Sequence, residues 1–98
     1  MSRDIIREEA RLIMLRELHG QTNYALNDAL LRDVLESFGI AKTREWVREE
    51  IGYLENVGAV TRTSAGSVVV AKLTPKGVEH VERRLVIEGV KRPSPAEA

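Results

Sequence analysis

Apolar positions in the first forty residues recur with the period of an α-helix, in two separate segments. The first runs from Asp4 to His19 and is apolar nearly all round in its second half, which is typical of a helix at the centre of a bundle. After a connector at 21–26, the second segment runs from Asp28 to Phe38, with Asn27 as its N-cap. Its expected buried stripe consists of Leu30, Leu31, Val34, Leu35 and Phe38.

A third helical segment follows after a short turn, Ile40 to Lys42. Thr43 is a suitable N-cap for it, and Gly58 ends it. Two helices joined by so tight a turn predict a helix-turn-helix motif. The buried face of the third helix is expected to consist of Val47, Ile51 and Leu54.

The pattern then changes to two short strands and a last helix. Residues 59–63 and 68–73 predict an antiparallel hairpin around a turn at 64–67. Thr74 and Pro75 follow as the N-cap and first residue of a helix. The buried stripe of that helix is expected to consist of Val78, Val81 and Leu85.

These elements predict a mainly α protein with a small β-hairpin, of the α+β class, in the order helix, helix, helix, strand, strand, helix. That layout is a winged helix-turn-helix domain, which we expect to cover residues 1–88. Residues 89–98 include Pro93 and Pro95 among small and charged residues, so we expect a disordered tail there.

Composition changes this picture only in part. Hydrophobic residues make up 43% of the 98 residues, enough to bury one small core. Fifteen basic residues balance fifteen acidic ones, so no basic excess points to nucleic acid. There is no cysteine, which excludes disulfides and cysteine-ligated zinc. The N-terminus has no long apolar run, so we expect a cytoplasmic protein without membrane contact.

Particular phrases resemble known families. Leu73-Thr74-Pro75-Lys76-Gly77 resembles the start of the last helix in bacterial winged-helix regulators of the ArsR and MarR kind. Over nearly its full length the chain also resembles a family of small Mu-like bacteriophage proteins, in the runs Arg11 to Leu18, Glu36 to Ile40, Val47 to Leu54 and Gly89 to Pro95. This resemblance implies a phage or prophage origin and a winged-helix fold, rather than an activity.

In winged-helix modules the second helix of the motif enters the major groove and the wing touches the neighbouring backbone. Glu45 and Glu49 lie on the outward face of the third helix. Because carboxylates repel phosphates, the basic residues nearby are expected to attract DNA only modestly. A glutamate can still accept a hydrogen bond from cytosine. Arg44 and Arg48 also fit ordinary solvated surface charge. The candidate DNA contacts are Lys42, Thr43, Arg44 and Arg48, with Arg62, Thr63 and Ser64 on the wing.

Four residues are candidates for binding a protein partner. Trp46 and Tyr53 share one side of the third helix, where they either cover the edge of the core or form a patch for a partner. Val68 and Val70 are expected to face outward from the second strand of the hairpin, where they serve strand formation or meet another subunit.

Catalysis has little support. His19 lies beside the helix-ending Gly20, and His80 is expected on a surface helix. Neither has the serine, cysteine or carboxylate arrangement of a triad. The chain also lacks a recognised metal spacing and a glycine-rich phosphate loop, so we expect neither a metal nor a cofactor. The leading hypothesis is a phage-encoded DNA-binding transcriptional regulator that acts as a dimer in the bacterial host's cytoplasm. The alternative is an adaptor that binds a phage or host protein and not DNA.

Overall fold

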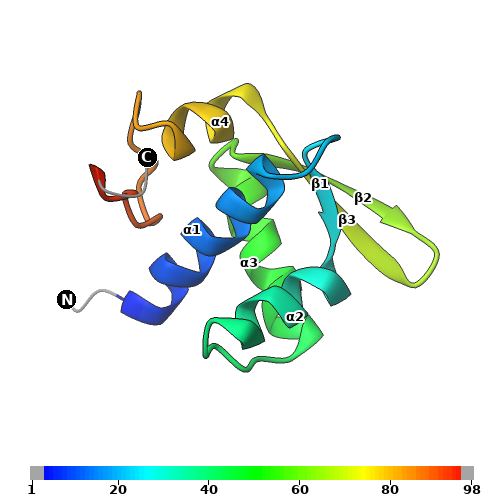
Figure 1. The fold of residues 1–98 in the computed structure, drawn as a ribbon. Helices are drawn as coiled ribbons and strands as arrows, with labels where there is room; N and C mark the ends of the chain where they lie inside the picture. The colour runs from blue at the N-terminus through cyan, green and yellow to red at the C-terminus, as the bar shows by residue number, and fades with distance from the viewer. Residues whose placement is uncertain (1–3, 96–98) are drawn as a thin grey trace.

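The computed structural model describes residues 4–95, in which a three-stranded antiparallel sheet packs beside a group of helices (Figure 1). The hairpin made by the last two strands projects from the body as a wing. In chain order the elements are α1 (Ile5–His19), β1 (Ala25–Asn27), α2 (Asp28–Ser37), α3 (Arg44–Asn56), β2 (Val60–Ala65), β3 (Val68–Leu73) and α4 (Pro75–Val81). The predicted winged-helix fold is confirmed.

Helix α1 lies at the centre of the molecule, as its nearly uniform apolar second half predicts. Four consecutive residues, Leu12 to Leu15, are buried together with Leu18. A helix can bury consecutive residues only when neighbours cover most of its circumference, and here α2, α3, α4 and β3 all contact α1. The core facing α1 consists mainly of Leu31, Leu35, Val47, Ile51, Leu54, Ala71 and Leu73.

The predicted helix starts are confirmed by their caps. Asn27, Thr43 and Thr74 each accept a hydrogen bond from the backbone N–H three residues further on. These bonds satisfy donors that the first turn leaves without a helical partner. Because the bonds are local, the sequence alone was enough to place the starts.

The sheet contains a strand that the sequence did not predict. Residues 21–26 were expected to be a connector, but β1 pairs antiparallel with β3, which lies at the centre of the order β1-β3-β2. Three residues carry too short an alternation to be recognised before their partner is known. The hairpin turn is also shorter than predicted, since Ala65 pairs with Val68 around Gly66 and Ser67.

The prediction of one buried stripe on α2 is partly wrong. Leu31 and Leu35 are buried, whereas Leu30 is 48% exposed and Phe38 is 61% exposed. At about 100° per residue, Leu30 points roughly 140° away from Leu35, so one core cannot cover both. The polar residue Asp28 occupies the buried side of α2 instead.

The C-terminal segment also departs from the expectation. Helix α4 ends at Val81, and Leu85 lies beyond it. The chain then turns back, so that Ile87 and Val90 are buried and the Lys91 N–H donates to the Glu8 carbonyl of α1. Residues 89–95 therefore pack on the body, where a disordered tail was predicted, and residues 96–98 lie outside the described part of the chain.

Candidate nucleic-acid interface

The N-terminal end of α3 meets the wing at a buried carboxylate. Asp28, the first residue of α2, is fully buried, and its Oδ1 accepts from the backbone N–H of Val69 on β3 at 3.0 Å. Its Oδ2 accepts from Arg48 Nε at 2.6 Å and from Arg44 Nε at 3.3 Å. One side chain thus joins α2, α3 and the wing, and we call these residues, with Ser67, the Asp28 cluster.

The two arginines of the cluster also hold the turn of the wing. The Nη2 atoms of Arg44 and Arg48 both donate to the carbonyl oxygen of Ser67, each at 2.9 Å. Their side chains remain 31% and 38% exposed. Within residues 4–95 their Nη1 groups donate to no protein atom, so each partly exposed arginine keeps donors without a protein acceptor.

The environment of Asp28 keeps it charged. Burial alone would raise the pKa of its carboxyl, but the hydrogen bond from Val69, together with the bond and charge of Arg48 and the charge of Arg44, outweighs burial. The pKa of Asp28 is therefore lower than its ordinary value. Two arginines and one carboxylate leave the Asp28 cluster with one net positive charge at neutral pH.

The remaining candidate DNA contacts lie around this cluster. Lys42 is exposed in the turn before α3, and the Thr43 hydroxyl accepts from the Trp46 N–H as the N-cap, which uses its oxygen but not its O–H donor. On the wing, Thr63 and Ser64 are exposed, and Arg62 pairs with Glu55 of α3 at 3.3 Å between Nη2 and Oε1. The structure therefore places these residues along α3 and the wing, while the acids between them balance their charge.

The outward face of α3 is acidic, as the sequence indicated. Glu45, Glu49 and Glu55 are exposed, and the Glu49 side chain is 68% exposed. Glu50, which counts as one more acid in the sequence, is 1% exposed and forms ion pairs with Arg7 and Arg11 of α1. Burial of Glu50 needs both arginines, which come from a helix some forty residues earlier, so its position in α3 gave no signal.

Cations of α1 and of the turn before α3 occupy the aromatic side of α3. The Arg11 guanidinium lies 3.6 Å from the centre of the Tyr53 ring, and the Tyr53 hydroxyl donates to the Glu88 carbonyl at 2.8 Å. Arg7 and Lys42 lie 5.0 and 5.4 Å from the centre of the Trp46 ring. Tyr53 thus closes the edge of the core, and both half-buried aromatics contact cations of the same chain.

The two valines proposed for a partner are only partly exposed. Val70 lies opposite Asn27 of β1, and Val68 lies opposite Ala65 at the end of the wing. The unpredicted strand β1 pairs with β3 at Val70. Less of the Val70 surface is therefore exposed than the hairpin alone implied.

The histidines take part in tertiary packing. His80 was expected on a surface helix but is fully buried, and its Nδ1 accepts from the Ile87 N–H at 3.0 Å. The hydrogen therefore resides on Nε2, which donates to the Lys91 carbonyl at 2.9 Å. His80 secures the returning C-terminal segment through these two bonds, and the surface prediction is wrong.

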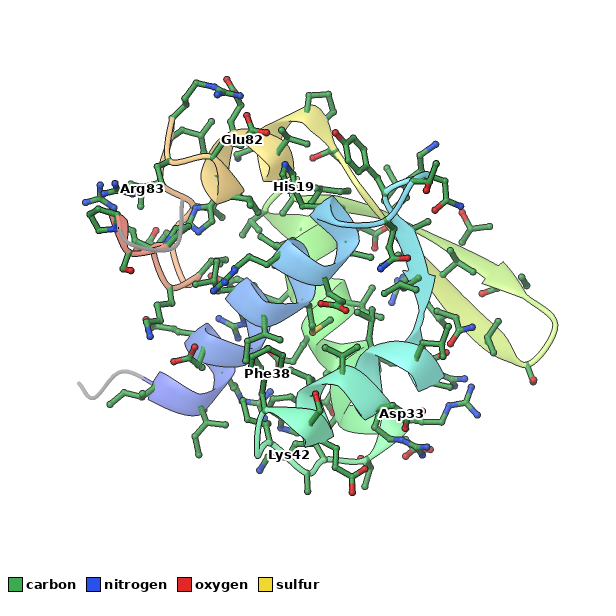
Figure 2. All side chains as sticks on the ribbon, in the orientation of Figure 1. His19, Asp33, Phe38, Lys42, Glu82 and Arg83 are labelled. Carbon is green, nitrogen blue, oxygen red and sulfur yellow. The ribbon has the colours of Figure 1, made fainter. Side chains whose placement is uncertain are left out.

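His19, at the end of α1, bonds to Glu82 after α4 at 2.9 Å between Nε2 and Oε2 (Figure 2). This bond, followed by the one from Arg84, lowers the pKa of the Glu82 carboxyl. Both groups are taken up in a surface contact between helices.

Across residues 4–95, no group of three or more histidine, aspartate or glutamate side chains is arranged to hold a metal ion. Nor does any helix in that range have the length and apolar character needed to span a membrane.

The tight α2–α3 pair and the β2–β3 wing define the class of this molecule, a winged helix-turn-helix protein. Its sequence is 37% identical over 95 residues to the uncharacterized protein gp26 of Escherichia phage Mu, covering 97% of this chain and 98% of gp26. The chain therefore belongs to the family of phage Mu gp26. No protein family model matches it.

The fold is similar to a solved regulator. Sco3205 is a MarR family transcriptional regulator from Streptomyces coelicolor, whose crystal structure was determined in complex with DNA. It superposes with a TM-score of 0.63 at 24% identity, over 76% of this chain and 45% of Sco3205. This chain thus spans less than half of the regulator's length, and the likeness shows the fold alone.

Proposed function

We propose that this protein binds double-stranded DNA through the N-terminal end of α3 and the adjoining wing, as a non-catalytic transcriptional regulator in the cytoplasm of the phage's bacterial host. The winged-helix fold supports the proposal, because such modules place the same two elements on DNA. The observation that carries it is the Asp28 cluster, where Arg44 and Arg48 meet the wing turn with free donors. The contact residues are Lys42, Thr43, Arg44, Arg48, Arg62, Thr63 and Ser64.

The proposed contact is mainly with the phosphate backbone. The exposed carboxylates of Glu45 and Glu49 lie on the part of α3 that would face the base edges. Carboxylates repel phosphates, whereas the arginines at the end of α3 and the hydroxyls of the wing are suited to them. A homodimer would double these contacts and offset the absence of a basic excess.

The proposal is tested by fluorescence anisotropy with a labelled random duplex across a range of salt concentrations. Four phosphate contacts per monomer predict a slope of about −3.6 in log affinity against log salt, and a dimer predicts roughly twice that. Arg48→Ala should weaken binding and reduce the slope by about 0.9 per monomer.

The matched control for this test is Arg83→Ala. It removes the same charge from a site just past α4 and away from the wing (Figure 2). Its affinity should stay close to that of the wild type. Equal effects of the two substitutions, or no binding at low salt, would refute the proposed interface.

One observation favours the alternative of a protein partner. Leu30 on α2 and Phe38 just after it are 48% and 61% exposed, and a hollow of about 480 Å³ between α2 and α3 is lined in part by Lys42 and Trp46. An adaptor would show no duplex binding at low salt. It would instead bind a phage or host protein. Trp46→Ala should abolish that binding, and Arg48→Ala should leave it unchanged.

A further inference from the structure

The Asp28 cluster presents a carboxylate at the place where the proposed function requires phosphate binding. Asp28 is fully buried, and each of its oxygens is bonded from an element other than α2. Its bonds span 16 residues to Arg44 and 41 residues to Val69. Asp28 therefore holds α2, α3 and β3 together, and no bond between near neighbours in the sequence fixes the relative positions of these elements.

The cluster also fixes two long cationic side chains. Arg44 and Arg48 would repel each other if the carboxylate between them were absent. With Asp28 in place, both guanidiniums bond to the same two acceptors, its Oδ2 and the Ser67 carbonyl. The side chains are thereby held in one arrangement, with their remaining donors beside the wing turn.

We infer that Asp28 is a positioning residue for DNA binding, which holds Arg44, Arg48 and the wing turn together as one preformed phosphate-binding unit. The inference rests on the proposed function and deepens it. In this inference the affinity for DNA depends on an acidic residue that itself makes no contact with DNA. A free flexible arginine must lose rotamer freedom when it binds phosphate, whereas one already fixed in place loses much less.

Asp28→Asn separates this inference from simple electrostatics by the sign of its effect. The substitution removes a negative charge close to the bound phosphates, so charge alone predicts tighter binding. Positioning predicts the reverse, because the amide no longer holds two cations and its NH₂ group faces arginine donors. Freeing two arginines should weaken binding roughly tenfold.

The matched control is Glu49→Gln, which removes one carboxylate from the exposed face of α3. Anisotropy with the random duplex at fixed salt should show tighter binding for Glu49→Gln and weaker binding for Asp28→Asn. The salt slope of Asp28→Asn should also fall, because fewer phosphates are contacted together. A purely structural loss would lower the folded fraction and leave that slope unchanged.

Asp28→Asn that binds as tightly as Glu49→Gln, with a native circular dichroism spectrum, would overturn the inference. Wild-type protein that fails to bind at low salt would instead overturn the proposed function. If Asp28→Asn does not fold, Arg48→Lys replaces it, since a lysine keeps the charge but cannot reach both Asp28 and Ser67 with a planar fork. Wild-type affinity in Arg48→Lys would then refute positioning.

Discussion

Replacing Gly77 by alanine tests why α4 can pack where it does. Gly77 lies in the first turn of α4 and is buried, and its N–H donates to the capping hydroxyl of Thr74 at 3.1 Å. A Cβ added there would overlap the carbonyl oxygen of Ala59 and would lie 2.5 Å from Leu73 Cδ1. The Ala59 carbonyl also accepts from the Thr74 N–H at 3.0 Å, so it cannot move without loss of that bond.

Two opposing effects set the size of the change at Gly77. Helix propensity favours alanine over glycine by up to about 1 kcal/mol. Forcing a methyl group into a packed interior costs about 1–3 kcal/mol, and the overlap here is with main chain, which yields less readily than a side chain. We therefore expect Gly77→Ala to lower the free energy of unfolding by about 2 kcal/mol. For a domain of this size the melting temperature should fall by roughly 10 °C.

Gly52→Ala in α3 is the matched control. The atom nearest to its added Cβ is Arg62 Nη1 at 3.7 Å, an ordinary contact, so propensity alone should act. This variant should be more stable than the wild type by up to about 1 kcal/mol. Urea and thermal unfolding followed by circular dichroism measure both changes. A Gly77→Ala protein as stable as the wild type would refute the close approach of α4 to the start of β2.

Two further predictions concern the returning segment and the buried carboxylate. Gly89→Ala should destabilise the protein by about 2 kcal/mol and speed amide exchange in residues 87–92, because Gly89 has φ +82° and a Cβ there would lie 2.6 Å from Tyr53 Cζ; unchanged exchange would contradict this. Because the pKa of Asp28 is lowered in the folded protein, its charge stabilises the fold above the unfolded value of about 3.9. That contribution is lost as pH falls through the lower folded pKa, so the stability gap between wild type and Asp28→Asn in urea should narrow from pH 7 to pH 3. If the difference in unfolding free energy stayed constant with pH, the ionised carboxylate of Asp28 would not be its cause.

The candidate site was predictable as a location and not as a set of contacts. The alternation of helical and strand patterns in the sequence was enough to place Arg44, Arg48 and Arg62 on α3 and the wing. Whether Arg44 and Arg48 were solvated or paired depended on Asp28, which the sequence presented only as the first residue of a helix. The predictions that Leu30 and Phe38 are buried, and that His80 is on the surface, failed for the same reason, since burial depends on the neighbouring elements.

The sequence by itself determined the features that arise from bonds between near neighbours. The caps at Asn27, Thr43 and Thr74 act over three residues, and the period of apolar positions follows from the geometry of a single helix. The tertiary structure alone decided β1, the packing of residues 89–95 and the partners of Asp28 and Glu50. Each of these depends on contacts between groups that are far apart in the chain. Such a contact is stabilised by all the elements that pack around it, so the sequence near either group does not determine it.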